Sequence, residues 1–350
     1  MKAYEKNIRK VDPYVPGEQP QHKVIKLNTN ENPYPPAPGV RDALMKMDVD
    51  RMRLYPDPTS GELVHTLAEY YGVKDEQVFV GVGSDDVLAM CFLTFFNSDK
   101  PILFPDITYS FYKVWAELYR IPYECPALNE EFRIVKEDYY KENGGIIFPN
   151  PNAPTSIYEN LEFIEDILSH NPDVIVIVDE AYIDFAGKSA MELIDKYDNL
   201  IVVQTFSKAR SMAGMRIGYA ISNPTLIKYL NDAKYSFNSY TMNQAALACG
   251  VESVKDRAYF EEQVNKIIDT REWAKDELRA LGFEFPDSQS NFIFVTHPKV
   301  SAKNLFEELK KQNIYVRFLG GERIQNYLRI SIGTREEMEQ LISFLKEFLK

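Results

Sequence analysis

The chain has 350 residues, 45% of them hydrophobic and 26% charged, which is ordinary for a globular protein with a sizeable core and room for about two domains. Its net charge of −12 argues against a nucleic-acid partner, and no stretch approaches the roughly 18 consecutive apolar residues of a membrane-spanning helix. The cysteines are scattered, the histidines have no metal-ligand spacing and the first residues form no signal peptide, so we expect a cytoplasmic protein without a disulfide framework or a metal site.

The first 38 residues predict an extended arm. They are rich in proline and end in the segment 28–36, where prolines follow one another closely. Proline fixes φ and removes a backbone donor, so this segment cannot form a helix. The tyrosines of the arm, Tyr4, Tyr14 and Tyr34, favour docking on another surface over disorder.

Residues 40–245 alternate between helices and short apolar strands. Helices are predicted at 40–48, 60–71, 86–96, 109–119 and 159–169, and strands at 77–82, 101–104, 121–125, 145–148, 173–178, 200–204 and 216–221. Such alternation predicts strand–helix–strand crossovers and an α/β fold, in which helices cover both faces of a mostly parallel sheet.

The pattern changes after residue 245. One long amphipathic helix is predicted at 257–281, followed by strands at 291–295, 314–318 and 327–332 and by helices at 301–312 and 334–349. These elements predict a smaller α+β unit. We therefore divide the chain into an arm (1–38), a large domain (39–248) and a small domain (249–350).

Two residues at the carboxyl ends of predicted strands suggest cofactor chemistry. Lys208 follows strand 200–204, at the edge of an open α/β sheet where ligands bind. A lysine held away from water there is nucleophilic enough for a Schiff base, although most lysines are solvated surface charges. Asp179 ends the neighbouring strand and suits a protonated pyridine nitrogen. A capping aspartate remains the alternative, whereas a Walker-B magnesium ligand is excluded because the chain has no P-loop.

A second group of residues suits a phosphate and a flat ring. The segment Gly81–Asp85 joins a strand to a helix, whose first backbone amides would bind an anion, unless the segment is only a tight turn. Arg216 follows Lys208 by eight residues. Tyr109 and Tyr182 lie near the same edge, where they can contact an aromatic ligand or simply pack. Together these residues predict one cofactor with an aldehyde, a ring nitrogen and a phosphate.

Further motifs accompany these residues: Leu27-Asn28-x-x-Glu31-Asn32-Pro33, Arg53-Leu54-Tyr55-Pro56-Asp57, Pro149-Asn150-Pro151-Asn152-x-Pro154-Thr155, Thr205-x-Ser207-Lys208-Ala209, Gly214-x-Arg216-x-Gly218-Tyr219 and Arg329-Ile330-Ser331-Ile332-Gly333. The set resembles the fold-type-I pyridoxal phosphate aminotransferases of class II over nearly the whole chain. The first two motifs are typical of its histidinol-phosphate branch. The resemblance implies pyridoxal 5′-phosphate as cofactor and exchange of the amino group of histidinol phosphate with 2-oxoglutarate in histidine biosynthesis.

The resemblance also implies a role for each matched residue. Lys208 carries the cofactor and moves the substrate proton, Asp179 keeps the pyridine nitrogen protonated, and Tyr182 hydrogen-bonds the phenolic oxygen. Tyr109 stacks on the ring. The cofactor phosphate is bound by Ser84, Asp85, Thr205, Ser207 and Arg216. Tyr55 reaches the cofactor of a neighbouring subunit, which implies a homodimer, and the substrate is held by Arg317, Arg329 and Tyr34.

The chain departs from the family pattern at one site position. The asparagine that usually hydrogen-bonds the phenolic oxygen falls on Ala153, so either Asn152 replaces it or Tyr182 acts alone. Other functions on the same scaffold are an aromatic amino acid aminotransferase and a threonine-phosphate decarboxylase. A non-catalytic binding protein is the remaining alternative, but it would have little reason to keep Lys208, Asp179 and Arg216 together.

Overall fold

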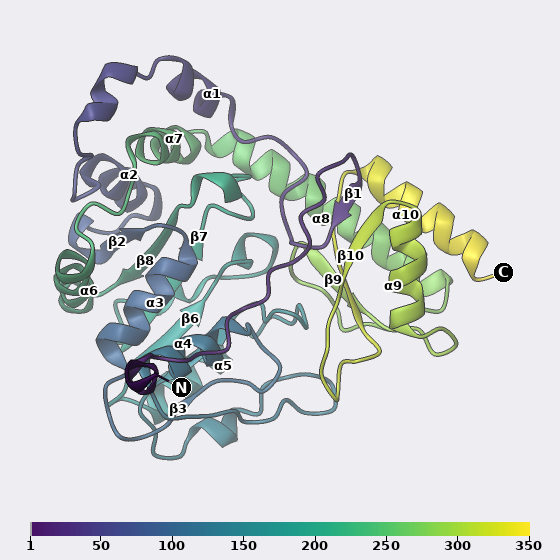
Figure 1. Cartoon of the computed structure of the whole chain (residues 1–350), viewed down its shortest axis with the longest axis horizontal. Coiled ribbons are helices and arrows are strands. Elements are labelled where there is room, and N and C mark those ends of the chain that lie inside the picture. The colour runs from purple at the N-terminus through teal and green to yellow at the C-terminus, as the bar shows by residue number, and fades with distance from the viewer. Residues whose placement is uncertain (1) are drawn as a thin grey trace.

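The computed structural model describes residues 2–350, which form two β-sheets with helices packed around each (Figure 1). The larger sheet has the strand order β2-β8-β7-β6-β5-β3-β4. Its strands are β2 (Val78–Gly81), β3 (Ile102–Leu103), β4 (Tyr123–Glu124), β5 (Ile146–Pro149), β6 (Val176–Asp179), β7 (Leu200–Thr205) and β8 (Gly218–Ser222).

The large sheet is mostly parallel, as predicted. Strands β4, β3, β5, β6 and β7 pair in parallel, and only β8 runs antiparallel to its two neighbours, β7 and β2. Alternate residues of one strand enter different apolar clusters: Val176 and Val178 one, Ile177 the other. Both faces are therefore buried, which explains why these strands are continuously apolar in sequence.

Helices cover both faces of this sheet. Residues of α3 (Ser84–Phe95), α4 (Phe111–Tyr119) and α6 (Pro224–Phe237) fill one cluster, and residues of α2 (Gly61–Tyr71), α5 (Leu161–His170) and α7 (Gln244–Lys255) fill the other. The sequence prediction omitted α6. Its start signal was present, because the Asn223 side chain accepts hydrogen bonds from two amides of the first turn and Pro224 follows it.

The smaller sheet has the order β1-β10-β11-β9. It packs with three helices on the right of Figure 1. These elements are β1 (Ile25–Leu27), β9 (Phe292–Val295), β10 (Ile314–Phe318), β11 (Leu328–Ser331), α8 (Arg257–Ala280), α9 (Ala302–Lys311) and α10 (Arg335–Phe348). Strand β1 comes from the arm and pairs in parallel with β10. The extended arm thus supplies an edge strand to a sheet built almost 300 residues later in the chain.

The arm also contacts the large sheet's helices before it reaches β1. The Tyr14 ring stacks on Phe111 of α4, with 4.3 Å between the ring centroids. Within the part of the chain that surrounds the large sheet, α1 (Pro38–Met45) packs on α7, and Asp256 caps α8 directly after α7 ends. The division into domains stays a proposal, and these contacts favour a boundary at Asp256. Across residues 2–350, no helix combines the length and the hydropathy needed to cross a bilayer.

Candidate active site

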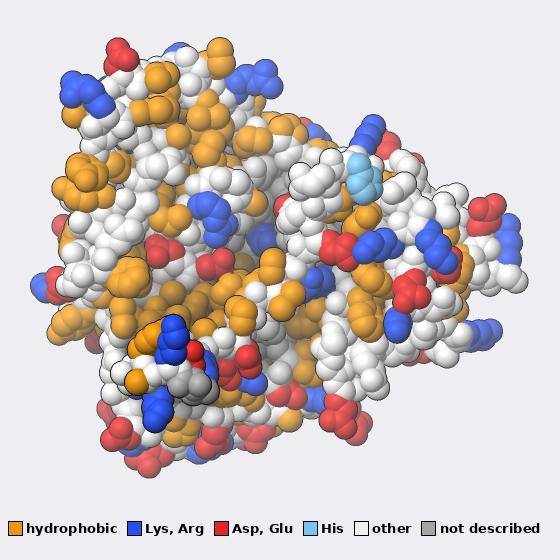
Figure 2. Space-filling model, in the orientation of Figure 1, with side chains coloured by type: hydrophobic (Ala, Val, Ile, Leu, Met, Phe, Trp, Pro, Cys, Tyr) orange, Lys and Arg blue, Asp and Glu red, His pale blue; other side chains and the backbone are white. Residues whose placement is uncertain are grey.

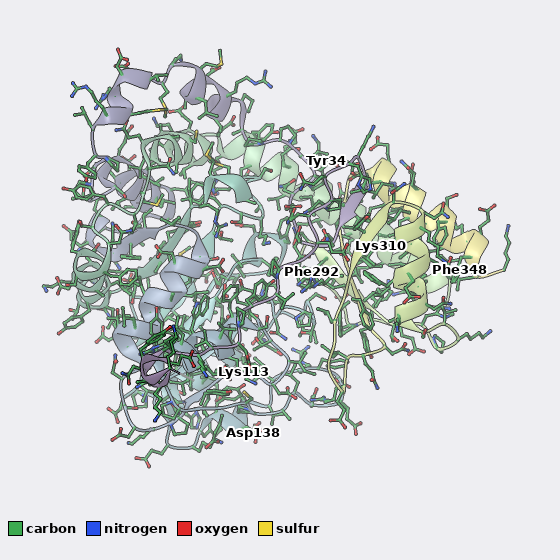
Figure 3. The ribbon with its side chains drawn as sticks, in the orientation of Figure 1. Tyr34, Lys113, Asp138, Phe292, Lys310 and Phe348 are labelled. Atoms are coloured by element: carbon green, nitrogen blue, oxygen red, sulfur yellow. The ribbon has the colours of Figure 1, made fainter. Side chains whose placement is uncertain are left out.

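A cavity of about 210 Å³ lies between the two sheets, where the carboxyl ends of β5, β6 and β7 face β10, β11 and the arm. In the space-filling view, a hollow between the two units contains charged side chains of both signs (Figure 2). Phe292 of β9 lies on the small unit's side of this junction (Figure 3) and packs edge-to-face on Tyr182, with 5.0 Å between the ring centroids. The cavity is thus lined by segments from both ends of the chain.

Lys208 lies in the wall of this cavity, just beyond β7. Its Nζ donates a hydrogen bond to the carbonyl of Thr29 at 3.1 Å and lies 5.7 Å from the centre of the Tyr182 ring. No carboxylate forms an ion pair with this amine within residues 2–350. The amine is held by a neutral carbonyl and an aromatic face, and it points into a space where a carbonyl compound could reach it.

Asp179 is buried at the end of β6 and also lines the cavity. The hydroxyl of Tyr112 donates to its Oδ2 at 2.8 Å, and the amide of Ala181 donates to its Oδ1 at 3.2 Å. Burial raises the pKa of this carboxyl to about 6, although both hydrogen bonds and nearby Lys208 act in the opposite direction. A cationic group bound beside Asp179 would relieve this cost of burial.

Tyr182 projects into the same cavity from the loop after β6. Its hydroxyl accepts a hydrogen bond from Nδ2 of Asn30 at 2.9 Å. The arm therefore reaches the centre of the site through Asn30, a residue that the sequence analysis did not name. Tyr109 lines the wall between the cavity and α4, and its hydroxyl donates to Oδ1 of Asp85 at 2.8 Å.

The predicted phosphate-binding residues gather at the end of the cavity near the start of α3. The guanidinium of Arg216 lies 3.4 Å from Oδ2 of Asp85 and 3.5 Å from the Ser207 hydroxyl. No side chain caps α3, so its first amides remain available to an anion. A Cβ on Gly83 would lie 2.4 Å from Nη2 of Arg216, so glycine is required for this close approach. Thr205 lies behind the cavity wall and hydrogen-bonds Ser207.

Two arginines form the opposite end. Arg317 of β10 and Arg329 of β11 are paired across the small sheet and both line the cavity. Arg317 donates to the carbonyl of Val15, and Arg329 donates to that of Asn28 at 3.2 Å. The Nε of Arg329 is buried without a partner, and burial lowers the pKa of this guanidinium. A bound anion would satisfy this donor and oppose that shift.

Five predicted site residues do not line this cavity: Ser84, Thr205, Asn152, Tyr34 and Tyr55. The amide of Asn152 is occupied within its own loop by Thr108, Ile107 and Thr155, and Ala153 lines the cavity instead.

Tyr34 is also outside the cavity, because the chain turns away after Asn32, whose side chain bonds the Ala209 carbonyl and the Tyr34 amide. The Tyr34 ring lies instead 5.4 Å from Nζ of Lys266 on α8. Tyr55 does not line this chain's own cavity, and its role in a neighbouring subunit stays a prediction. It is 79% exposed and stacks on Tyr240.

Sequence reasoning missed three residues of the site: Asn30, Tyr112 and Tyr14. Asn30 and Tyr14 belong to the arm. The tyrosines of the arm predicted that it docks on another surface, but not which of its residues reach the site. Tyr112 follows Tyr109 by three positions, which would place both on one face of the helix predicted at 109–119. In the structure Tyr109 precedes α4, and its ring packs edge-to-face on that of Tyr112 with 5.7 Å between the centroids. That spacing was the available signal for a second tyrosine at the site.

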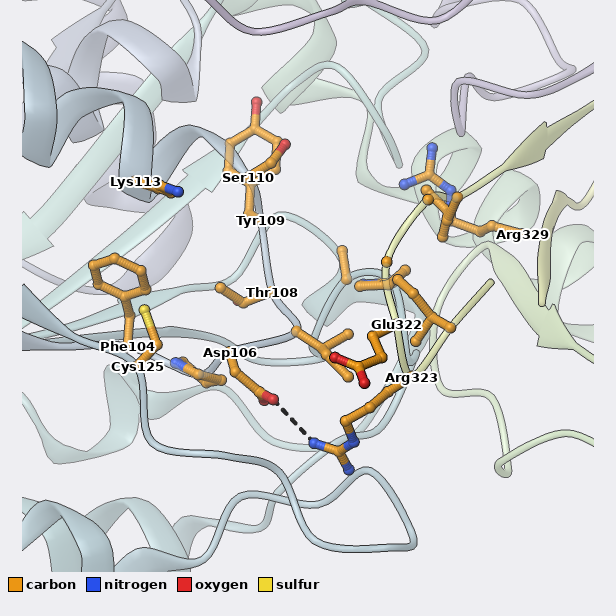
Figure 4. A pocket seen from close by; sticks show the side chains of 18 of the residues that line it. Phe104, Asp106, Thr108, Tyr109, Ser110, Lys113, Cys125, Glu322, Arg323 and Arg329 are labelled. Atoms are coloured by element: carbon orange, nitrogen blue, oxygen red, sulfur yellow. Dashed lines mark hydrogen bonds and ion pairs between the residues drawn. The ribbon is translucent and has the colours of Figure 1, made fainter. Parts of the chain in front are cut away.

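A second cavity, of about 510 Å³, adjoins the first along Tyr109, Ala153 and Arg329 (Figure 4). Its outer wall is closed by Arg323, which donates to Oδ2 of Asp106 at 2.9 Å. The two cavities share Tyr109, Ala153 and Arg329 in their walls and therefore lie next to each other.

Comparisons with known proteins agree with this geometry. Residues 22–345 match the family model described as aminotransferase class I and II. The chain is 49% identical over 351 residues to the histidinol-phosphate aminotransferase of Clostridium botulinum (strain Okra / Type B1), covering 100% of this chain and 99% of that protein. It is 50% identical over 347 residues to the enzyme of that name from Clostridium acetobutylicum, covering 99% of each.

Solved structures show the same fold at lower identity. A histidinol-phosphate aminotransferase from Sinorhizobium meliloti, solved in complex with pyridoxal-5′-phosphate, superposes with a TM-score of 0.85 at 22% identity, over 93% of this chain and 91% of that one. An L-threonine-O-3-phosphate decarboxylase from Porphyromonas gingivalis gives a TM-score of 0.77 at 22% identity, over 93% and 99%. These likenesses establish the fold.

Proposed function

Because this chain belongs to the aminotransferase class I and II family, we propose that it transfers the amino group of L-histidinol phosphate to 2-oxoglutarate, with pyridoxal 5′-phosphate as cofactor. The observation that carries the proposal is one cavity that holds Lys208, Asp179 and Arg216 at one end and the arginine pair at the other. Relatives named for this reaction match the chain over its full length at about half identity.

The cavity fits the proposed cofactor. Arg216, Ser207 and the open first turn of α3 offer donors for a phosphate, and the absence of a Cβ at Gly83 leaves the guanidinium close to that turn. Asp179 is buried and lines the cavity, where its carboxylate can pair with a protonated ring nitrogen. When bound, pyridoxal phosphate supplies an aldehyde for the amine and a ring that accepts electrons from the substrate carbon.

Each residue of the site has its own role in the proposed reaction. Lys208 would hold the cofactor and would carry a proton away from and back to the substrate. Asp179 would keep the ring nitrogen protonated, and Tyr112 and Ala181 fix the direction of that carboxylate. Tyr109 would pack beside the ring, and Tyr182 would donate to the phenolic oxygen.

The arginine pair suits both substrates of the proposed reaction. Histidinol phosphate carries a phosphate, and 2-oxoglutarate carries a second carboxylate. Guanidinium groups bind both anions through parallel hydrogen bonds, which makes Arg317 and Arg329 suitable for each substrate in turn. The buried, unpartnered Nε of Arg329 supports this assignment.

A homodimer is part of the proposal. Exposed large apolar side chains gather on two segments of the large unit: Leu44, Met45, Val49, Met52, Leu54 and Tyr55, together with Tyr229, Tyr235, Phe237 and Tyr240. Apolar side chains are visible at the upper left of Figure 2, around α1, and at its left edge, near α6. A second copy covering this surface would remove it from water and bring Tyr55 to the partner's cavity. The free thiols of the three cysteines support the proposed cytoplasmic location.

The test is a comparison of amino donors. Purified dimer loaded with pyridoxal phosphate is mixed with histidinol phosphate, phenylalanine or O-phosphothreonine, and the loss of yellow colour and the formation of glutamate from 2-oxoglutarate are followed. We expect histidinol phosphate to give the highest kcat/KM by at least about tenfold. Preference for phenylalanine, or release of carbon dioxide from phosphothreonine, would assign the chain to one of the related activities.

A further inference from the structure

The phenolic oxygen of the cofactor has an unusual environment in this chain. The resemblance implies an asparagine donor at the position of Ala153, whose methyl side chain lines the cavity and donates no hydrogen bond. Asn152 cannot replace it, because its amide is occupied within its own loop. Tyr182 is therefore left as the donor from this side of the site, and whatever orients its hydroxyl controls that contact.

We propose that Asn30 of the arm is the positioning residue that compensates for Ala153, by holding the Tyr182 hydroxyl so that its proton is donated to the cofactor's phenolic oxygen. The inference rests on the proposed function, since it requires bound pyridoxal phosphate. Asn30 itself does not contact the cofactor in this proposal, and it acts through Tyr182.

The hydrogen bonds around Asn30 fix the orientation of its amide. The Ser331 hydroxyl accepts from the Asn30 backbone amide at 2.9 Å, so its single proton is free for another acceptor. That acceptor is Oδ1 of Asn30, also at 2.9 Å. With Oδ1 facing Ser331, the Nδ2 group must face Tyr182, to which it donates at 2.9 Å.

This arrangement determines the role of the tyrosine. Because Asn30 offers an N–H, Tyr182 accepts on its oxygen and keeps its own proton for another partner. Within residues 2–350, no hydrogen bond uses that proton, and the ring lines the cavity. Asn30 is only 1% exposed, and Asn291 donates to its backbone carbonyl at 3.0 Å, so the backbone of Asn30 is held in place as well as its side chain. The hydrogen bonds from Ser331 to Asn30 and from Asn30 to Tyr182 therefore leave the Tyr182 proton free to be donated into the cavity.

The backbone conformation at position 30 offers another reason for the presence of asparagine there, which the test must exclude. Its φ is +56°, in the left-handed region that asparagine tolerates well, so asparagine could be present for conformation alone. Glycine adopts the same conformation without strain and has no amide side chain. Asn30→Gly therefore removes the hydrogen bond and retains the backbone.

The experiment measures the pH midpoint of the visible absorption change of the cofactor-loaded protein. A donor to the phenolic oxygen stabilises the negative charge on that oxygen. The nitrogen that joins Lys208 to the cofactor then loses its proton more easily, so loss of the donor raises the pH midpoint of the absorption change. We expect Asn30→Gly to raise it by about half to one pH unit. Ser331→Ala, which frees the amide to rotate, should raise it in the same direction by less. Tyr182→Phe removes the hydroxyl itself, so its shift of the midpoint gives the full effect of losing the hydrogen bond to the phenolic oxygen.

The matched control restores the missing asparagine. In an Ala153→Asn background, the phenolic oxygen has a second donor, and we expect Asn30→Gly to shift the midpoint by less than half as much as in the natural chain. A midpoint unchanged in both Asn30→Gly and Ser331→Ala, while Tyr182→Phe shifts it, would overturn the inference. If Asn30→Gly does not fold, Ser331→Ala alone decides. A natural chain that takes up no cofactor would instead overturn the proposed function.

Discussion

The two walls of the cavity are built in different ways. One wall comes from the carboxyl ends of β5, β6 and β7, so Asp179 and Lys208 are brought together by strands that pair directly in register. The other comes from the arm and the small sheet, where Asn30 meets Ser331 across 301 residues of sequence. We call these the sheet wall and the arm wall. The residues of the sheet wall can be found from local sequence patterns, whereas those of the arm wall come together only when distant segments of the chain fold against each other.

The difference matters for function, because each wall holds a different kind of chemistry. The sheet wall contains the amine and the carboxylate that would act on the cofactor. The arm wall contains the arginines and the asparagine that would hold the substrate and orient Tyr182. Substitutions in the sheet wall should therefore change the chemical step, and those in the arm wall should change substrate binding and fine control. The following predictions test that division, beginning with the largest effect.

Lys208→Ala should remove catalysis almost entirely. The variant loses both the attachment point of the cofactor and the group that moves the substrate proton, and we expect kcat to fall by about 10⁴-fold or more. The dimer should remain folded by size-exclusion chromatography and circular dichroism. More than a trace of activity in the folded variant would show that the sheet wall does not carry the chemistry.

Arg329→Ala should weaken substrate binding on the arm wall. Loss of charge-assisted hydrogen bonds to the substrate anion costs about 3 kcal/mol, so kcat/KM for histidinol phosphate should fall roughly 100-fold, mostly through KM. Arg323→Ala is the matched control, because that arginine pairs with Asp106 at the far wall of the second cavity. Equal losses in both variants would argue against a specific anion site.

Asp179 should make the stability of the cofactor-free protein depend on pH. Burial raises its pKa from 3.8 to about 6, so the folded state binds a proton more tightly than the unfolded state. Its contribution to the free energy of unfolding is therefore largest at low pH and falls as pH rises toward 6. Between pH 4.5 and 7, the natural chain should lose about 2 kcal/mol relative to Asp179→Asn in urea titrations. Parallel pH profiles of the two proteins would refute the raised pKa.

Tyr55→Phe should produce the smallest change. Loss of one hydroxyl hydrogen bond to a partner's cofactor costs about 1 kcal/mol, so the Kd for pyridoxal phosphate should rise roughly fivefold. Tyr240→Phe serves as control, since Tyr240 stacks on Tyr55. An unchanged Kd in Tyr55→Phe would remove the reason to place this residue at a neighbouring subunit's cofactor.

The sequence singled out Asp179 and Lys208 of the sheet wall, and the resemblance singled out Arg317 and Arg329, but neither pointed to Asn30, for a physical reason. Asp179 and Lys208 stand out because polar residues that directly follow buried apolar strands are rare and lie at one sheet edge. Asn30 carries no such local mark, and its partners on β11 depend on the arm docking as β1. The choice between Asn152 and Tyr182 alone could not be made from the sequence for the same reason, because only the folded loop shows that the Asn152 amide is occupied there and that Ala153 lines the cavity.

The most direct test of the account is the identity of the residue that holds the cofactor. The purified protein is loaded with pyridoxal phosphate, reduced with borohydride to fix the bond, digested and mapped by mass spectrometry. The account predicts that the modification lies on Lys208 and is absent from the Lys208→Ala variant. Modification of another lysine at equal occupancy, or none at all in a protein that transfers amino groups, would contradict it.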